Sequence, residues 1–421
     1  MYKSFKEINQ EQKKELGYKI EEAVEAIAQG FAASKHNCAV AFSGGKDSTV
    51  LWHLIRTHFP DKKYKVIFGN TGVEFPESLK FARELGAKWG GSDFYEATPA
   101  KTEKDGLKYQ AQKEVLRYLI DSGKLKTVLK PDGKLKSTAA LERACPPELY
   151  EDFKRRNLIW KAGTTMNYWW CADQYGYPIL GKAASKLTAR RINIDCFLAY
   201  SKTTSEKDEI KEYYELLKNV KMSNHCCAIL KKEPSERLQA ELDVDVIFKG
   251  LMAEESQMRR LNFCTRGYLF ESSRPHLGND PFYHCNPLSI WTDSDIWEYI
   301  HRFNVPYSSL YDIEYLDHNG EFKKIKRNGC IWCATDIAFR NNHLSVLRQT
   351  HPKLWETGMK LGLGDEIMNL QKYKSNGVPN MMNVLDSAEE VVDRRPCAFD
   401  DVAFHIEHNA VIDSLYDAEQ D

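Results

Sequence analysis

A pair of glycines between an apolar run and a helical pattern constrains this chain more than any other feature. Residues 38–42, CAVAF, read as a buried strand, and residues 48–59, STVLWHLIRTHF, have the periodicity of a helix. The turn between them lets backbone N–H groups converge at a helix N-terminus, whose partial positive charge favours a phosphate. Lys46 adds a mobile cation, and Asp47 is suited to orient the loop or a magnesium ion. We therefore predict a phosphate-binding loop over residues 43–49; the alternative is a tight turn without a ligand.

Strand-like and helix-like segments alternate on both sides of this loop. The pattern predicts a helix within residues 10–30, a strand over 64–70 and a helix opened by Pro76. Further strand-like segments occur at 192–200 and 244–251, and residues 292–303 begin with the polar residues of a capped helix. Such alternation is typical of an α/β fold with a doubly wound parallel sheet.

Composition changes divide the chain into five predicted segments. Residues 96–190 are rich in charged and aromatic residues and are interpreted as a helical insertion into the core, and the acidic tail at 413–421 is predicted to be disordered. The segments are an N-terminal helix at 1–36, the first half of the core at 37–95, the insertion at 96–190, the second half of the core at 191–335 and a C-terminal helical region at 336–421.

Charge and hydropathy restrict the surroundings in which we expect this protein. The 59 basic residues balance the 60 acidic ones, so general electrostatic attraction to nucleic acid is not indicated, although local basic patches remain open. No apolar run has the length of a membrane helix, and the first residues contain no signal-peptide core. We expect a cytoplasmic protein without a membrane partner. In that reducing compartment the 11 cysteines favour metal binding over disulfides.

Four sequence elements resemble one known family. The loop SGGKDS at 43–48 is similar to the pyrophosphate loop of N-type ATP pyrophosphatases and lacks the glycine spacing of a Walker loop. FGNTGVEFPES at 68–78, GLMAEESQMRR at 250–260 and the segment 287–312 resemble elements of the PAPS reductase family, in the same order. The resemblance implies an adenine nucleotide alpha-hydrolase-like, Rossmann-like fold.

The same resemblance implies a site for ATP and Mg²⁺, with Lys46 and Asp47 as catalytic residues. Asn70 stands where the family usually has Asp, and Met252 where relatives often carry Arg. Arg259 and Arg260 are candidates to replace that arginine, unless they form a solvated helix face. The full set of nucleotide-binding candidates is Ser43, Gly44, Gly45, Lys46, Asp47, Ser48, Thr49, Asn70, Thr71, Gly72, Gly250, Glu255, Ser256, Arg259 and Arg260.

Two close pairs of cysteines form a candidate metal site: Cys226 with Cys227, and Cys330 with Cys333. Adjacent side chains point apart, which suits the large body of an iron–sulfur cube better than a single zinc ion. The arrangement resembles the cysteine set that holds a 4Fe-4S cluster in APS reductases. A zinc site and unligated buried thiols remain the alternatives.

The remaining cysteines and an aromatic cluster have simpler interpretations. Cys38, Cys171, Cys196, Cys264 and Cys285 are interpreted as packing residues, and Cys145 and Cys397, beside prolines, as loop thiols. His225, next to the cysteine pair, is expected to be a donor near the metal and not a ligand. A local core is favoured over base stacking for the aromatic cluster of Tyr168, Trp169, Trp170, Tyr175 and Tyr177.

The intact loop separates the activities that the family implies. Family reductases act on APS or PAPS, usually lose the loop lysine, and carry a cysteine in an ECGLH-type segment, which residues 322–421 lack. We therefore expect an ATP pyrophosphatase or adenylyltransferase that forms AMP and pyrophosphate and takes part in sulfur transfer, as in DNA phosphorothioation or tRNA thiolation. The expected partners are an adenine nucleotide, a sulfur donor such as a cysteine desulfurase and a nucleic-acid acceptor. The alternatives are an APS or PAPS reductase producing sulfite, and a nucleotide-binding accessory subunit of a defence or mobile-element complex. The sequence does not indicate an oligomeric state.

Overall fold

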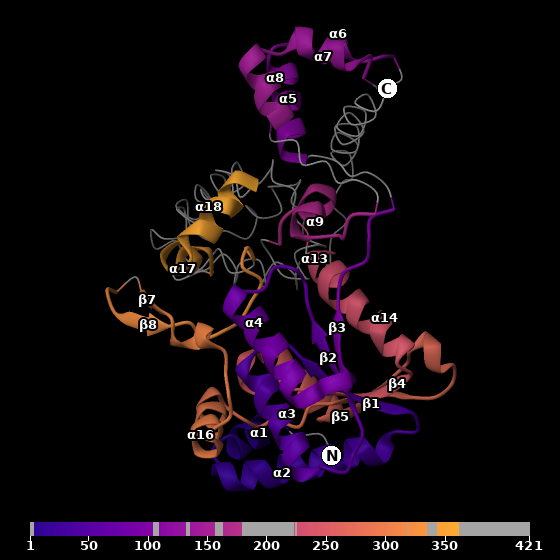
Figure 1. Cartoon of the computed structure of the whole chain (residues 1–421), viewed down its shortest axis with the longest axis vertical. Coiled ribbons are helices and arrows are strands. Elements are labelled where there is room, and N and C mark those ends of the chain that lie inside the picture. The colour runs from indigo at the N-terminus through magenta and orange to yellow at the C-terminus, as the bar shows by residue number, and fades with distance from the viewer. Residues whose placement is uncertain are drawn as a thin grey trace. The chain divides into compact units, whose positions relative to one another are not determined.

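The computed structural model describes residues 4–103, 109–131, 135–155, 163–178, 223, 225–317, 319–334 and 343–361. The chain divides into two compact units. The first unit comprises Met1–Pro99, Leu230–Tyr315 and Phe322–Cys330, and the second comprises Ala100–Ile229, Leu316–Glu321 and Ile331–Asp421. Figure 1 labels helices and strands along the chain.

A six-stranded, mostly parallel sheet forms the centre of the first unit, in the order β3-β2-β1-β4-β6-β5. Val40 of β1 pairs with Val66 of β2 on one side and with Phe248 of β4 on the other. Only β5 runs antiparallel, against β6. The strands are β1 (Asn37–Phe42), β2 (Lys65–Gly69), β3 (Phe94–Ala97), β4 (Val244–Lys249), β5 (Leu269–Ser272) and β6 (Phe282–Cys285).

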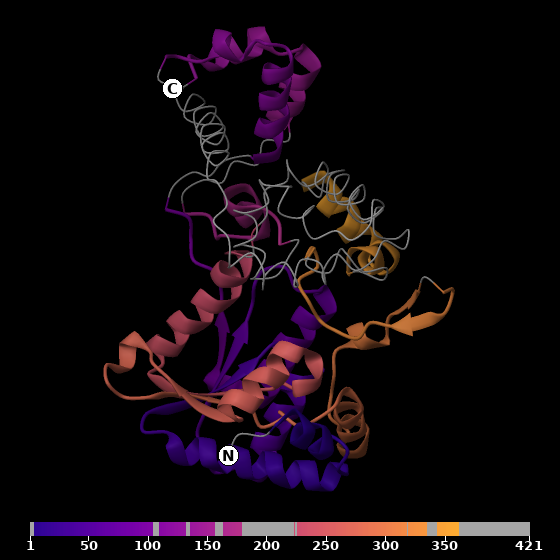
Figure 2. The ribbon, with the colours of Figure 1, turned by 180° about the vertical axis from the view of Figure 1, so that it is seen from behind.

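Helices cover both faces of this sheet, because alternate side chains of its inner strands are apolar on both sides. Val40 and Phe42 of β1 pack with α3 residues such as Leu54, whereas Ala39 lies in the cluster against which Leu238 of α14 packs. Helices α3 and α4 are seen in front of the sheet in Figure 1, and α14 is seen from the opposite side in Figure 2. The predicted α/β class with a doubly wound parallel sheet is confirmed.

The helices of the first unit largely follow the sequence pattern, with two differences at their ends. The expected helix at 10–30 is two helices. The first is capped by Ser4 and ends at Glu11, and the second begins at Leu16 after a break in which the Gln12 carbonyl accepts from Lys19 Nζ. The helix after the loop begins at Lys46, two residues earlier than expected. The helices are α1 (Phe5–Glu11), α2 (Leu16–Ala33), α3 (Lys46–His58), α4 (Pro76–Leu85), α14 (Glu233–Glu241), α15 (Gln257–Arg266) and α16 (Asp293–Phe303).

Short elements connect these helices and strands. One is a two-stranded sheet of β7 (Glu314–Leu316) and β8 (Phe322–Lys324), which the sequence pattern did not indicate. The others are the helical turns η1 (Gly86–Gly90), η2 (Gly91–Asp93), η3 (Ala228–Lys232), η4 (Ala253–Glu255), η5 (Pro275–Leu277) and η6 (Ser309–Asp312).

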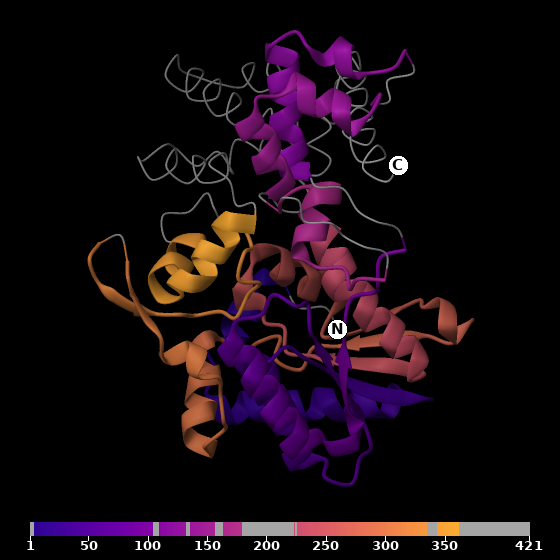
Figure 3. The same ribbon diagram turned by 45° about the horizontal axis from the view of Figure 1, so that its top comes forward.

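The second unit is helical in the residues that the structure describes. Helices α5 (Tyr109–Asp121), α6 (Leu125–Val128), α7 (Thr138–Ala144) and α8 (Pro147–Arg155) form a group seen in Figure 3, with a core that includes Leu119 and Phe153. The other helices are α9 (Tyr168–Tyr175), α13 (His225–Cys227), α17 (His343–Thr350) and α18 (Pro352–Leu361). Across the described ranges, no helix is long and apolar enough to cross a membrane.

One prediction for this unit is confirmed in position, and three lie outside the described residues. Cys145 lies in the short connection between α7 and α8, as expected, but its thiol is buried in the core of α5–α8. The strand predicted at 192–200, which contains Cys196, lies outside the described residues, as do Cys397 and the tail at 413–421.

Candidate nucleotide site

The loop at 43–49 connects β1 to α3, and its side chains hold its own backbone. Gly45 is the N-cap of α3, and its carbonyl accepts hydrogen bonds of 2.9 Å from Ser48 Oγ and from Thr49 Oγ1. Ser43 N donates to Ser48 Oγ at 3.2 Å. Gly44 has φ +70°, and a Cβ there would lie 3.1 Å from the Ser78 carbonyl. Glycine therefore satisfies both the backbone conformation and the tight packing at position 44.

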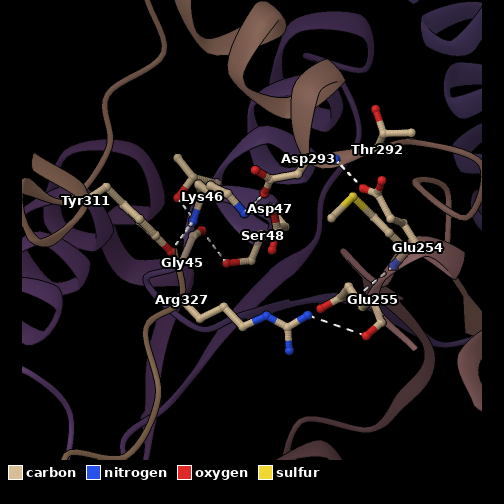
Figure 4. A network of polar contacts seen from close by, with 12 residues as sticks. Gly45, Lys46, Asp47, Ser48, Glu254, Glu255, Thr292, Asp293, Tyr311 and Arg327 are labelled. Carbon is tan, nitrogen blue, oxygen red and sulfur yellow. Dashed lines mark hydrogen bonds and ion pairs between the residues drawn. The ribbon is translucent and has the colours of Figure 1, made fainter. Parts of the chain in front are cut away.

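Lys46 lies buried at the first turn of α3 between two carboxylates. Its side chain is 4 % exposed, and Nζ lies 2.8 Å from Asp47 Oδ1 and 2.8 Å from Asp293 Oδ1 (Figure 4). Burial by itself lowers the pKa of Lys46, but the two carboxylates outweigh it, so the pKa lies above its ordinary value. Tyr311 closes the other side, because its hydroxyl accepts from Lys46 N at 3.2 Å and its ring centroid is 5.8 Å from Nζ. Burial raises the pKa of Tyr311 to about 12.

The second predicted group, Asn70, Thr71 and Gly72, follows β2 at the same edge of the sheet, where the carboxyl ends of parallel strands meet. Asn70 Oδ1 accepts from Gly72 N at 2.8 Å, and Asn70 Nδ2 donates to Glu96. Thr71 Oγ1 donates to Glu74 Oε1 at 2.6 Å. The contact with Glu96 explains why an amide suits position 70, since an aspartate there would face a second carboxylate.

Gly250 follows β4 and packs directly against the loop. A Cβ at Gly250 would lie 2.9 Å from the Asp47 carbonyl and 3.1 Å from Ser48 N, so this position accepts only glycine without rearrangement. The sequence motif therefore marks a close approach of two backbones.

The rest of the 250–260 element builds a charged turn. The Met252 side chain is buried in the hydrophobic core, and its backbone N–H donates to Glu255 Oε2 at 3.0 Å. The methionine therefore does not supply the charged contact that an arginine would make at this position. Ser256 Oγ caps α15 by accepting from Arg259 N at 3.2 Å, and the Arg259 guanidinium pairs with Glu255. Burial and the nearby charge of Arg327 lower the pKa of Arg259. Both Arg259 and Arg260 are partly buried, so a freely solvated helix face is not what is observed.

Several residues of this site were not singled out from the sequence. Asn328 Nδ2 donates to the Ser43 carbonyl at 2.9 Å, and Arg327 Nη2 donates to the Glu255 carbonyl at 3.5 Å. Glu254 Oε2 accepts from Asp293 N at 2.6 Å. Asp293 and Tyr311 lie within the 287–312 element, although neither was predicted as a site residue. Arg327 and Asn328 lie just before the second cysteine pair, where only the cysteines were predicted to have a function.

The four predicted cluster cysteines have different surroundings. In the second unit, a hydrogen bond with Cys227, burial and the neighbouring thiols of Cys171 and Cys333 raise the pKa of Cys226. In the first unit, Cys330 Sγ lies 3.8 Å from Thr71 Oγ1. Among the described residues no group of three or more His, Cys, Asp or Glu side chains is arranged to hold a metal ion. Cys330 belongs to the first unit and the other three cysteines to the second, so the iron–sulfur cluster stays a prediction, and we derive no chemical step through it.

Other predicted residues near these cysteines lie in a small aromatic core. Tyr168, Trp169 and Tyr177 are buried, as the local-core interpretation expects, but Trp170 is only partly buried and Tyr175 is exposed. The ring centroids of Trp169 and Trp332 are 4.9 Å apart. His225 stacks on Tyr175 with ring centroids 4.8 Å apart and contacts Ser223 through Nδ1. Cys38, Cys171 and Cys285 are buried, in agreement with packing roles, while Cys264 is only partly buried.

The fold and the site define a doubly wound α/β protein in which a glycine loop, a helix N-terminus and basic side chains meet at the carboxyl edge of the sheet. Residues 37–132 and 157–335 match the family model described as phosphoadenosine phosphosulfate reductase domain, more than half of the chain. The chain therefore belongs to this family.

Individual relatives match over shorter regions. An adenosine 5'-phosphosulfate reductase of Burkholderia cepacia is 32% identical over 139 residues, covering 33% of this chain and 45% of the relative. The same enzyme of Bacillus cytotoxicus is 30% identical over 93 residues, covering 22% and 35%. A phosphoadenosine 5'-phosphosulfate reductase of Xylella fastidiosa (strain M23) is 33% identical over 86 residues, covering 20% and 32%. The chain thus spans less than half the length of these relatives.

Among solved structures, a phosphoadenylyl-sulfate (PAPS) reductase from Candida auris in complex with phosphate matches 74% of this chain and 93% of its own. The sequence identity is 13% and the TM-score is 0.32, so we draw no residue correspondence from this match.

Proposed function

We propose that this chain is an enzyme that binds ATP at the loop 43–49 and cleaves it between the α and β phosphates, forming AMP or an adenylated acceptor together with pyrophosphate. The observation that carries the proposal is the position of Lys46, whose buried ammonium group lies 2.8 Å from each of two carboxylates, Asp47 and Asp293, at the N-terminus of α3. A cation there is suited to a phosphate chain at a helix N-terminus.

The two carboxylates favour ATP over a nucleotide that binds without metal. Mg²⁺ is commonly held by one or two carboxylates together with substrate phosphates, and Asp47 and Asp293 would supply that pair. For a metal-free phosphosulfate the same carboxylates would oppose the negative charge of the ligand. When bound, the metal would supply charge neutralisation at the phosphates.

The reaction follows from the charges around the loop. An acceptor oxygen, or water, bonds to the α phosphorus and loses its proton, while the bond from the α phosphorus to the bridging oxygen breaks and pyrophosphate takes the electron pair. Lys46 and the loop N–H groups stabilise the charge that develops on this leaving group. Arg259, half-buried and partnered by Glu255, adds a second cation beside the loop.

A second candidate is the reduction of APS or PAPS to sulfite, and the comparisons favour it, because the relatives with matching segments are named as such reductases. Both candidates use an adenine nucleotide at the same loop and differ in the bond that breaks. Each relative matches over less than half its length, so its name does not decide the reaction of this chain.

Sulfur transfer extends the first candidate. An adenylated nucleic acid gives a sulfur nucleophile a good leaving group, AMP. The persulfide of a cysteine desulfurase would displace AMP and bond to the acceptor, and a second thiol would then cleave the S–S bond, leaving the thiolated acceptor and a disulfide. A catalytically inactive accessory subunit is the remaining alternative, and it would bind ATP without releasing pyrophosphate.

Product analysis tests the proposal. The protein is incubated with magnesium and ATP, with and without nucleic acid, and separately with APS or PAPS and a thiol reductant. We expect AMP and pyrophosphate from ATP, and loss of this activity by more than tenfold in Lys46→Ala, because the charge on the leaving group loses its cation. The exposed Lys80 provides a matched control, Lys80→Ala, that should retain activity. Sulfite without pyrophosphate would establish the second candidate, and ADP with orthophosphate would exclude the first.

A further inference from the structure

We propose that Arg327 is a phosphate-binding residue of this site and that it makes the site selective for nucleotides with a phosphate beyond the α phosphate. The inference rests on the proposed function. It assigns the recognition of the pyrophosphate portion of ATP to a residue outside the loop and outside the 250–260 element.

Asn328 fixes the segment that carries Arg327 against the loop. Its Nδ2 donates to the Ser43 carbonyl at 2.9 Å, and its Oδ1 lies 2.6 Å from the place where a Cβ of Gly45 would be. Any side chain at position 45 would therefore collide with Asn328. The absence of a Cβ at Gly45 allows the 322–330 segment to lie directly on the phosphate loop.

Arg327 has no carboxylate partner within the described parts of the chain, in contrast to the other cations of the site. Lys46 has Asp47 and Asp293, and Arg259 has Glu255. Among the described residues, Arg327 makes one hydrogen bond, the 3.5 Å contact from Nη2 to the Glu255 carbonyl, at the long limit of such bonds. Figure 4 shows its side chain extending from beside Gly45 towards Glu255. The exposed guanidinium thus keeps donors available for a ligand.

Arg327 also lies close to Arg259 and increases the positive charge beside the loop. The two guanidinium groups are near enough for Arg327 to lower the pKa of Arg259, and Asp47 of the loop lies near enough to oppose that shift. Two neighbouring guanidinium groups, one of them partly desolvated, repel each other until an anion lies between them. Their planar donors match the oxygens of phosphate in pairs.

The ligand chemistry is a tetrahedral oxyanion attached to the α phosphate. In the proposed function it is the β phosphate with its γ phosphate, and in the reductase alternative it would be the sulfate of APS. AMP lacks both groups, so its binding should not depend on Arg327. The ratio of ATP binding to AMP binding therefore distinguishes a residue that contacts the phosphates from one that only supports the loop.

Calorimetry with ATP, pyrophosphate and AMP, in the presence of magnesium, tests this assignment on the full chain. We expect Arg327→Ala to weaken ATP and pyrophosphate binding by about tenfold or more, since a charged hydrogen-bonding partner is lost, and to change AMP binding by less than about twofold. Arg327→Lys should lie between the two, because it keeps the charge and loses the paired donors. The neighbouring exposed Lys326 supplies the control variant Lys326→Ala, which should bind all three ligands like the parent.

The outcomes are distinguishable. Equal loss of ATP and AMP binding in Arg327→Ala would mean that the residue only supports the loop, and unchanged pyrophosphate binding would remove it from the site; either result overturns the inference and leaves the proposed function standing. Asn328→Ala, in contrast, should weaken ATP and AMP alike, because it releases the segment from Ser43. In a further titration with APS, binding of APS but not of ATP to the parent, with loss of that binding in Arg327→Ala, would overturn the proposed function and replace the phosphate by sulfate.

Discussion

Single residues at the carboxyl edge of the sheet have partners that explain their identity. Asn70 occupies a position where the family usually has Asp, and its side-chain N–H contacts Glu96, which Arg83 also holds at 2.8 Å. Arg83 and then Asn70 lower the pKa of Glu96 through their hydrogen bonds, so this carboxylate is charged at neutral pH. The contact with Glu96 at the end of β2 therefore explains the asparagine. The turn at Gly72 is retained, because Asn70 Oδ1 still accepts from Gly72 N.

Restoring the family residue tests this explanation. We expect Asn70→Asp to destabilise the fold by about 1–3 kcal/mol, because it replaces a hydrogen bond with two facing carboxylates. Adding Glu96→Gln should recover most of the loss, since the amide can donate to the new carboxylate. Urea denaturation measures both, with the exposed Asn262→Asp as the control. Equal stability of Asn70→Asp and the parent would contradict the role given to Glu96.

His284 gives a second residue-scale prediction, on pH. Its Nδ1 lies 2.9 Å from Lys249 Nζ and its Nε2 lies 3.0 Å from Ser272 Oγ. Burial, and then the charge of Lys249, lower the pKa of His284 from 6.5 to about 3. The unfolded chain therefore takes up a proton below pH 6.5 that the folded chain refuses until about pH 3, so stability falls as the pH falls through this window.

The expected slope from His284 is about 1.4 kcal/mol of unfolding free energy per pH unit inside that window. His284→Asn should flatten the acid side of the stability profile relative to the parent, whatever its stability at neutral pH. The exposed His58 offers the matched variant His58→Asn, in which the acid limb should persist. Parallel profiles for the parent and His284→Asn between pH 6 and 4 would show that another group dominates acid unfolding.

At the scale of elements, the sequence was most informative where segments are long or carry a motif. β1, β4, α3 and α16 were predicted because their apolar runs, periodicity or capping residues are strong. β3, β5 and β6 are four residues each and β7 and β8 three, which is too short for periodicity to separate a strand from a loop. Their pairing depends on neighbours that are distant in sequence, as for β5 beside β6.

Helix α2 gives an element-scale prediction from two glycines in one helix. A Cβ at Gly30 would lie 2.5 Å from the ring of Phe248, a fully buried β4 residue, whereas a Cβ at Gly17 would have no heavy atom within 4 Å. We expect Gly30→Ala to lower stability by about 1–3 kcal/mol through overpacking. Gly17→Ala should be neutral or stabilise by up to about 1 kcal/mol, because alanine favours the helix.

Chemical denaturation of the two variants checks the packing of α2 on the sheet. The test is sharp because the substitution is identical and both positions lie in one helix, so helix propensity acts in the same direction on both. Equal shifts of the two midpoints would mean that α2 does not pack on β4 as described.

At the scale of the whole molecule, the sequence predicted the family and the loop but not the set of residues around Lys46. Asp293, Tyr311 and Arg327 are more than 240 positions away along the chain, and their approach to the loop follows from the fold of the sheet and its connections. Met252 shows another limit of motif matching. The position aligns with the family element, but its side chain packs in the hydrophobic core and not in the site. Spacing within a motif therefore located one edge of the site, and tertiary packing supplied the rest.

The cysteine pairs are the main whole-molecule prediction that geometry leaves to experiment. Cys226, Cys227, Cys330 and Cys333 were predicted as ligands of a 4Fe-4S cluster because four thiolates are the usual ligand set. If this is correct, anaerobically purified or reconstituted protein should contain about four irons and four sulfides per chain and absorb light at about 400 nm. Each Cys→Ser variant of the four should lose most of the iron, because one lost ligand destabilises the whole centre. Cys264→Ser, at a partly buried cysteine outside the set, should keep it. Stoichiometric zinc without iron after reconstitution under argon would replace the cluster by a zinc site, and the absence of any bound metal would leave the four as ordinary thiols.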